Sequence, residues 1–507
     1  MQTPFVTEPK MCTSIRSIRF LAVLLLSLWC QGAVPAAAQS EPPVWYKTSI
    51  LSDTPQNSES PAIIADGLGY VHLFWDEDFG GEPFEPEVNP HAGNSIFYRR
   101  WDGVSWTSPV DILSVPGEAI AAFVAADVDR DNRLHVVWTG QTDFYYSNAP
   151  AWQAESAHAW SQPRVVATDS ARSKSESAIV ADAAGHVHIL YATRGDEPGI
   201  YHIRSDDVGV TWGPATELSG PFDRLERSFS NVQVITDGAG RLHAVWQTNE
   251  KAGYGQAVYY ARSLDEGQTW SAPVQLGYRD PGDFEASYPY LVSTSDSELH
   301  LIYLDGWHRG RSHRISHDGG ETWSEPMHIL PDLEGVTGYV FPLVDGSGQM
   351  HLIINMRTVE QVGGMYYARW TGSSWTPVQA FIKPGDPNLG AAHYTAGTVR
   401  LGNELHVVWQ LLDKGEIGHI YGVVPSVPQA TPSLAPSLQA PTPSPSPTPG
   451  LRSTPINPQS IQPAVNPAPA ALETGITARA VWFGFGLPFL AVLILVGLIL
   501  VRARQKR

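Results

Sequence analysis

The sequence predicts an all-β protein built from seven four-stranded repeats, and three observations support this prediction. The 507 residues include 17 Trp, 45 Gly and 41 Pro, a composition typical of many short strands joined by turns. An alternating strand pattern with one central histidine recurs along the chain, with gaps from 51 residues (His300 to His351) to 63 residues (His72 to His135), long enough for one four-stranded unit. A turn motif of eight residues also repeats between strand patterns.

The turn motif has the pattern Ser-x-Asp-x-Gly-x-Thr-Trp and occurs three times. Glycine accepts a positive φ without steric strain, the Asp carboxylate accepts N–H bonds across the turn, and the Trp packs between neighbouring sheets. Cation binding by the Asp is the alternative, but a single turn offers too few oxygen ligands for calcium. We therefore assign a structural role to Ser205, Asp207, Gly209 and Trp212, to Ser263, Asp265, Gly267 and Trp270, and to Ser316, Asp318, Gly320 and Trp323.

This motif resembles the Asp-box, or bacterial neuraminidase repeat, of sialidases and of many β-propellers that are not sialidases. The resemblance implies a β-propeller of four-stranded blades, for which the repeat count favours seven blades and leaves six possible. Sialidases that resemble this chain have six blades, so a seventh is a departure from that family. In the family the box is a structural turn remote from the active site, and it therefore indicates a fold more than a reaction.

The ring is expected to close through the N-terminal strand. Trp-x-x-Pro, or a version one residue shorter, marks the fourth strand of six repeats, and the seventh repeat ends near Val424 without it. The segment Trp45–Leu51 resembles such a strand, and we expect it to complete the last blade and leave no open edge. The repeated histidines, one per blade, cannot converge on one ion, so we expect a structural role for them, no metal site and no cofactor.

The flanking segments predict a secreted, membrane-anchored protein. Residues 1–38 read as a signal peptide that contains both cysteines, Cys12 and Cys30, so the mature chain has no disulfide. Residues 39–424 form the propeller, 425–479 a Pro-rich stalk, 480–501 a transmembrane helix and 502–507 a basic cytoplasmic tail. We expect a single-pass cell-membrane protein with an extracellular propeller. A lipid or peptidoglycan-linked anchor with a cleaved tail is the alternative.

The charge balance limits the partners. Residues 1–38 contain three of the 33 basic residues and one of the 51 acidic residues, which leaves 30 bases, 50 acids and a net charge of -20 in the mature chain. Such an acidic protein argues against nucleic acid or an anionic membrane surface as the partner. We expect a monomer that binds an extracellular glycan or protein.

Candidate ligand-binding residues lie in the loops opposite the turn motifs. Arginine and acidic side chains suit polar or charged ligands, and Tyr and Trp can stack on a sugar ring. A solvated or ion-paired loop position is the alternative for the arginines. The candidates are Arg224, Arg279, Arg309, Arg357, Asp283, Glu285, Tyr288, Asp305 and Trp307, with Tyr339 and Tyr394 at comparable strand starts.

Two main functions remain open at this stage. Recognition of an extracellular glycan or protein needs only the fold, the stalk and the anchor. An exo-α-sialidase or related glycoside hydrolase would need three arginines on a carboxylate, a Tyr nucleophile beside a carboxylate, and an Asp acid/base. The Arg-Ile-Pro motif of the sialidases is absent, so no catalytic residue can be assigned, and we favour recognition. A purely structural stalked protein is the third possibility.

Overall fold

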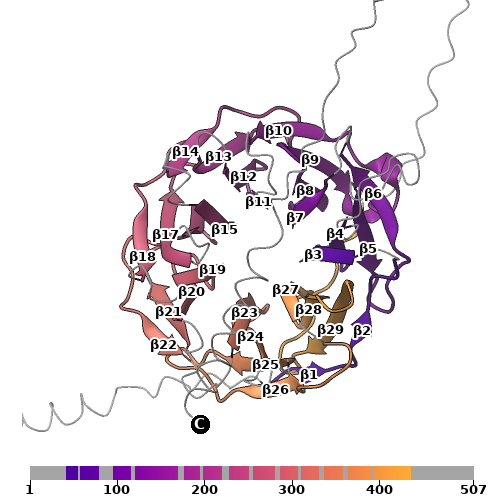
Figure 1. Ribbon diagram of the computed structural model, residues 1–507, viewed down its shortest axis with the longest axis vertical. Coiled ribbons are helices and arrows are strands. Elements are labelled where there is room, and N and C mark those ends of the chain that lie inside the picture. The colour runs from indigo at the N-terminus through magenta and orange to yellow at the C-terminus, as the bar shows by residue number, and fades with distance from the viewer. Residues whose placement is uncertain are drawn as a thin grey trace, which may run out of the picture. The chain divides into compact units, whose positions relative to one another are not determined.

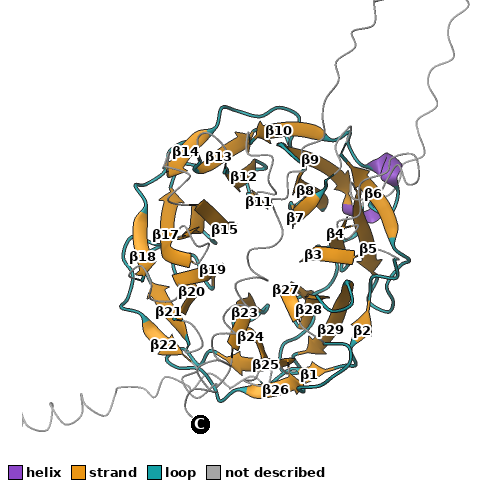
Figure 2. Ribbon diagram, viewed as in Figure 1, coloured by secondary structure: helices purple, strands orange, loops and turns teal. Residues whose placement is uncertain are grey.

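The computed structural model is a β-propeller of seven four-stranded blades, which confirms the all-β class and the count of seven (Figures 1 and 2). The inner strands surround the axis and the outer strands form the rim (Figure 1). The described residues are 41–54, 57–78, 95–115, 120–169, 176–194, 198–219, 228–249, 255–279, 286–306, 310–329, 336–357, 363–389 and 392–435.

Each blade is one antiparallel sheet whose strands run in order from the axis outward. Blade 1 is formed by β3 (Asn57–Ala65), β4 (Val71–Asp78), β5 (Ser95–Trp101) and β6 (Val110–Ser114). Blade 2 is formed by β7 (Ala122–Val128), β8 (Arg133–Thr139), β9 (Asp143–Pro150) and β10 (Arg164–Thr168). Blade 3 is formed by β11 (Ser177–Ala181), β12 (Val187–Ala192), β13 (Ile200–Ser205) and β14 (Thr216–Ser219). Blades 4 and 5 are formed by β15 (Ser228–Thr236), β16 (Leu242–Asn249), β17 (Gly255–Ser263) and β18 (Val274–Tyr278), and by β19 (Ala286–Ser293), β20 (Leu299–Asp305), β21 (Arg311–Ser316) and β22 (Met327–Ile329). Blades 6 and 7 contain β23 (Val336–Val344), β24 (Met350–Arg357), β25 (Gly363–Arg369) and β26 (Gln379–Ile382), and β27 (Ala392–Arg400), β28 (Glu404–Leu411) and β29 (Glu416–Val423).

The N-terminal segment closes the ring as expected, although in two short strands. β1 (Val44–Trp45) and β2 (Ser49–Ile50) both pair antiparallel with β29, so blade 7 combines strands from the two ends of the propeller. Trp45 stacks on Phe381 of blade 6, with ring centroids 4.1 Å apart. The closure therefore ties blade 7 to blade 6 and covers the outer edge of β29.

Hydrogen bonds explain why the box turns need their particular residues. In the turn at Ser263, the hydroxyl accepts the N–H of Gly267 (2.8 Å) and donates to Asp265 (2.8 Å). The same carboxylate accepts the N–H of Thr269 (2.8 Å) and its hydroxyl (2.6 Å). Equivalent bonds hold the turns at Ser205 and Ser316. The Asp side chains are therefore turn formers, and the Trp lies just before the fourth strand.

The repeated histidines form a row of buried hydrogen bonds within every blade. Each histidine on the second strand joins a carboxylate to a Tyr or His ring on the third strand, and both bonds are 2.7–3.3 Å long. The third-strand ring is Tyr98, Tyr146, His202, Tyr260, His313, Tyr367 or His419. These bonds satisfy polar groups that would otherwise be costly to bury, so the histidines are structural.

A Trp of the following blade packs against the third-strand ring and so links the blades. Trp212, Trp270 and Trp323 lie edge-on to Tyr146, His202 and Tyr260, with centroids 5.0–5.1 Å apart. Trp45 takes this position on Tyr367, at 6.3 Å, where the ring closes. Sequence repetition in the box turns therefore specifies contacts between blades as well as the turns themselves.

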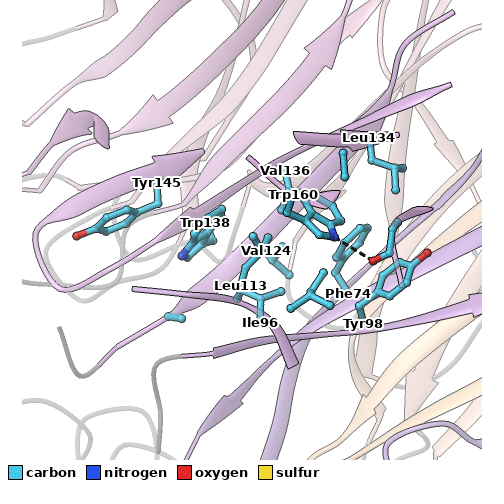
Figure 3. Close-up of a cluster of buried hydrophobic side chains, with 14 of the residues drawn as sticks. Phe74, Ile96, Tyr98, Leu113, Val124, Leu134, Val136, Trp138, Tyr145 and Trp160 are labelled. Atoms are coloured by element: carbon cyan, nitrogen blue, oxygen red, sulfur yellow. Dashed lines mark hydrogen bonds between the residues drawn. The ribbon is translucent and has the colours of Figure 1, made fainter. Parts of the chain in front are cut away.

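Apolar cores fill the interfaces between neighbouring blades. Figure 3 shows the core between blades 1 and 2, where Phe74 and Tyr98 meet Val124 and Val136. Trp160 packs edge-on against Phe74 within this core and donates its indole N–H to the carbonyl of Ala154, at 2.9 Å. Six further clusters occupy the other interfaces around the ring, so each blade is buried on both faces.

Hydrogen bonds also link the inner strands, which do not pair with one another as a sheet. Asp127 of β7 accepts the N–H of Ala181 in β11 at 2.8 Å, and Thr398 of β27 accepts that of Ala65 in β3 at 3.1 Å. Gln233 of β15 accepts the N–H of Leu291 in β19 at 2.7 Å. Side chains thus satisfy backbone groups that face the axis.

The predicted signal peptide, most of the stalk, the transmembrane helix and the basic tail lie outside the described residues. Within the described segments, no helix is both long and apolar enough to cross a membrane. The only helical elements there are the single-turn 3-10 helices η1 (Ala151–Gln153) and η2 (Ala157–Ala159) of blade 2.

Candidate ligand-binding site

The propeller has two distinct faces. The turns between first and second strands and the box turns share one face, which we call the box face. The opposite face, called the loop face, is where the inner strands begin and the second strands end. We expected the candidate residues on the loop face, and two of them lie there in the described residues: Tyr288 near the start of β19 and Asp305 at the end of β20.

Bulges mark the start of most inner strands on the loop face. In β3, β7, β15, β19, β23 and β27, two residues oppose one on the neighbouring strand. The first bulged residue takes a positive φ in five cases, namely Ser60, Phe123, Asn231, Tyr288 and Tyr394, with values from 34° to 51°. Bulky residues rarely adopt this conformation, which costs on the order of 1–3 kcal/mol each. β11 shows no such bulge, so blade formation does not require it.

Four of these bulges bring aromatic rings together. Tyr288 lies edge-on to Tyr339 at 5.1 Å, and Tyr339 contacts Tyr394 at 5.7 Å between ring centroids. His393 packs against Tyr339 at 5.2 Å, and Phe123 of β7 reaches Tyr394 at 6.1 Å. Tyr288, Tyr394 and Phe123 are only partly buried. We call these five side chains the axial cluster.

A polar network borders the axial cluster on blade 4. The side-chain oxygen of Gln247 accepts the N–H of Tyr288 at 2.7 Å and the side-chain amide of Asn231 at 2.8 Å. The Gln247 amide donates to Asn249 at 2.6 Å, and Asn249 in turn donates to Ser230 at 2.9 Å. These bonds fix the bulge that presents Tyr288.

The electrostatics keep the tyrosines of the axial cluster protonated. Burial, reinforced by the negative charges of Glu176 and Glu59, raises the pKa of Tyr394. Burial and the neighbouring Tyr288 raise the pKa of Tyr339 well above its usual value. Burial also raises the pKa of the Glu176 carboxyl, although the charge of Arg194 opposes this shift. At neutral pH these phenols are hydrogen-bond donors and not phenolates.

The structure places only some of the predicted ligand-binding residues. Tyr288 belongs to the axial cluster, whereas Arg279 forms an ion pair with Asp305, which also accepts the hydroxyl of Ser312 at 2.6 Å. Arg357 is the last residue of β24, and nothing is described of its side chain. Outside the described residues lie Arg224, Asp283, Glu285, Trp307 and Arg309.

Sequence reasoning missed several members of this site. Phe123, Asn231 and Gln247 were not among the candidates, and Tyr339 and Tyr394 were noted only for their position. Alignment of the starts of the first strands would have revealed the aromatic members, because four of the seven repeats carry Phe or Tyr at the bulge, but it would not have revealed Asn231 or Gln247. The bulge itself has no sequence signal here, since glycine occupies none of the five positive-φ positions.

One group on the box face has the composition of a metal site. Ligand atoms of Asp182, His186 and His188 lie within 4.8 Å of one another. The indole N–H of Trp270, which can only donate, is 3.2 Å from Nδ1 of His202. The proton of His202 therefore sits on Nε2 and is donated to His188 Nδ1 at 3.1 Å. This leaves the His188 proton on Nε2, directed at Asp182 at 3.3 Å, so the group is satisfied without an ion.

The fold defines the class as a seven-bladed β-propeller, with an aromatic and polar cluster on its loop face. No protein-family model and no curated protein sequence matches this chain. Among solved structures it is similar to the lectin BP39L from Burkholderia pseudomallei, with 14% identity and a TM-score of 0.52 over 75% of this chain and 99% of the lectin. It is also similar to an ulvan lyase, a polysaccharide lyase, with 9% identity and a TM-score of 0.50 over 76% and 96% of the two chains.

Sialidases are among the more distant neighbours. A point mutant of the NanB sialidase from Streptococcus pneumoniae has 11% identity and a TM-score of 0.44, over 75% of this chain and 70% of the sialidase. All of these identities are too low to show more than the fold. The lectin and the ulvan lyase, whose TM-scores are 0.52 and 0.50, therefore support the fold and no particular activity.

Proposed function

We propose that the protein is a membrane-anchored propeller that recognises an extracellular glycan or protein ligand through its loop face. The axial cluster carries this proposal, because bulky aromatic residues occupy strained conformations that the blade does not need. Partly exposed Tyr and Phe rings beside amide and carboxyl groups are what a sugar ring with its hydroxyls requires. A glycan is therefore the favoured ligand.

Hydrolysis of a sialoside is the second candidate, and one observation favours it. Tyr394 lies within electrostatic range of Glu59 and Glu176, as a Tyr nucleophile activated by a carboxylate would. The raised pKa of Tyr394 argues the other way, because burial and the carboxylates hold the phenol protonated. In addition, Arg279 is already paired with Asp305 and is not directed to a substrate carboxylate. Recognition without turnover is the better account.

The test is binding of the purified ectodomain, residues 39–424, to glycan and protein arrays, beside hydrolysis of a fluorogenic sialic acid substrate. We expect glycan binding and no turnover above that of Arg309→Ala. Turnover that Arg309→Ala abolishes would make the protein a sialidase. If the folded ectodomain binds to neither array and does not hydrolyse the substrate, only a structural role would be left.

A further inference from the structure

A hollow of about 640 Å³ lies on the box face, where blades 2 and 3 meet. Its walls come from the β7–β8 turn, the end of β9 with the segment that follows, and the box turn of blade 3. The lining includes Asp131, Arg133, Asn148, Trp152 and Arg164. This site is on the face opposite the axial cluster and is independent of the function proposed above.

The residue at one repeat position of blade 2 explains the space. Blades 3 and 4 have an arginine two residues after the third-strand ring, and this arginine reaches the next box turn. Arg204 donates to the carbonyl of Glu266 at 2.6 Å, and Arg262 donates to that of Gly319 at 2.9 Å. In blade 2 the equivalent residue is Asn148, whose shorter side chain contacts the carbonyl of Val208 at 3.3 Å. The volume that the guanidinium groups of Arg204 and Arg262 fill in blades 3 and 4 is therefore open in blade 2.

The insertion after β9 supplies an apolar wall. Blade 2 has η1 and η2 where blades 3 to 5 have the eight-residue box turn, and η1 places the half-buried Trp152 beside the hollow. Arg100 donates to the carbonyl of Trp152 at 3.4 Å and forms an ion pair with Glu155 at 3.0 Å. The insertion is thus held in place from blade 1, and the wall is preformed.

The hollow also contains two arginines without a carboxylate partner among the described residues. Arg133 donates to the side-chain oxygen of Asn148 at 2.8 Å, and Arg164 donates to the carbonyl of Val210. In blade 4 the residue equivalent to Arg133 is Arg241, which pairs with Asp237 at 2.6 Å. Each guanidinium has five N–H donors, so most donors on the two blade 2 arginines remain available to a ligand.

The hollow has two carboxylates, of which Asp129 is hydrogen-bonded within the protein and Asp131 faces solvent. Asp129 accepts the backbone N–H of Arg133 at 2.8 Å and bonds to His135 at 3.2 Å. Asp131 is exposed at the rim, and no side-chain bond to it is seen among the described residues. The carboxylate of Asp131 repels a bare inorganic anion. It can, however, accept hydrogen bonds from the hydroxyl groups of a ligand that carries both an anionic group and hydroxyls.

We propose that this hollow binds a saccharide unit that carries an oxyanion, either a carboxylate or a sulfate. Arg133 and Arg164 hold the oxyanion by charge-assisted hydrogen bonds, which planar guanidinium groups form in bidentate geometry. Trp152 packs against the apolar face of the sugar ring, and Asp131 accepts ring hydroxyls. A neutral sugar satisfies only part of this site.

The test is isothermal titration of the full-length protein in detergent with glucuronic acid, glucose 6-sulfate and glucose. We expect at least one anionic sugar to bind, with glucose much weaker, and the tighter of the two anionic sugars identifies the oxyanion. Arg133→Gln should weaken binding at least tenfold. Arg130→Gln is the matched control, because Arg130 is exposed in the same turn, donates to the carbonyl of Ala183 and does not line the hollow.

A second variant separates loss of binding from loss of folding. Asn148→Arg introduces the residue of blades 3 and 4 and fills the hollow, so it should abolish binding. The thermal unfolding midpoint should fall only slightly, because Arg133 loses one hydrogen bond, which shows that the variant still folds. Tyr288→Ala, in the axial cluster, should leave this binding unchanged, which distinguishes the two sites. The proposal is overturned if neither anionic sugar binds, if glucose binds as tightly, or if Arg130→Gln and Arg133→Gln behave alike.

Discussion

Replacement of His202 by Tyr tests the hydrogen-bonded rows that link the blades. His202 is 1% exposed, and burial, with the neighbouring His188 and the charge of Arg204, lowers its pKa to about 3. Four other blades carry Tyr at this position, and Tyr260 bonds to His243 at 2.7 Å in the same arrangement. The substitution therefore keeps the row and removes a group that gains a proton on unfolding in acid.

The expected effect follows from proton linkage. Because the folded pKa of His202 is below its unfolded value of 6.5, its contribution to stability is complete above pH 6.5 and declines as the pH falls toward 3. Because the limiting slope is about 1.4 kcal/mol per pH unit, the wild type should lose about 2 kcal/mol more than His202→Tyr between pH 6.5 and 4.5. At pH 7 the variant should be about 1 kcal/mol less stable, because Trp270 loses its acceptor.

Equilibrium urea unfolding of the ectodomain at pH 7.0 and 4.5 measures this difference. Trp212 and Trp323, which face Tyr rings, already have no acceptor for their indole N–H among the described residues, so the loss at Trp270 is tolerable. His158→Tyr, at an exposed position of η2, is the control and should leave the pH dependence unchanged. If His202→Tyr loses as much stability in acid as the wild type, the buried row does not govern the acid response.

Three further predictions concern the same framework. Burial raises the pKa of Asp127 to about 6, so the ionised carboxylate destabilises the folded state above pH 6, and this destabilisation disappears as the pH falls toward 4. Asp127→Asn should therefore raise the free energy of unfolding in urea by at most about 3 kcal/mol at pH 7.5, and by almost nothing at pH 4. Gly267 has φ +81° and an added Cβ would lie 2.8 Å from His202, so Gly267→Ala should lose about 3 kcal/mol, whereas Gly240→Ala, with φ +79° and open space, should lose only about 1 kcal/mol. Equal losses by thermal melting would contradict a contact between blades at the box glycine. Trp45→Ala should lower the free energy of unfolding in urea by about 3 kcal/mol, because it removes the closure contact with Phe381. Tyr46 is 50% exposed, so Tyr46→Ala should lower the same free energy by about 1 kcal/mol or less.

The sequence was most informative where a local motif determines a local structure. The box turns, the blade count and the closing strand could all be predicted, because turn chemistry and strand alternation act over a few residues, the turn motif occurs three times and the strand pattern seven times. The partners of the histidines could not be predicted, since each row joins two strands, and in six blades the third-strand ring also contacts a Trp of the next blade. Which side chains meet depends on the pairing register between strands, and the sequence alone did not determine that register.

The candidate site was predicted less well for a similar reason. Tyr288 was identified from its residue type, but its contacts depend on bulges that shift the register of six inner strands. Arg279 and Asp305 were proposed as separate ligand contacts, and they instead pair with each other across blades 4 and 5. Charged residues in loops satisfy one another when the fold brings them together, and a single sequence does not show which ones meet.

The affinity of the ectodomain for a glycan selected on the array, measured for Tyr288→Ala beside Tyr278→Ala, tests the central claim most directly. Tyr288 lies in the axial cluster, and Tyr278 is 48% exposed on the outermost strand of blade 4. We expect Tyr288→Ala to weaken binding at least tenfold, equivalent to about 1.4 kcal/mol, and Tyr278→Ala to leave it unchanged. Equal affinity of the two variants would show that the ligand does not bind at the axial cluster.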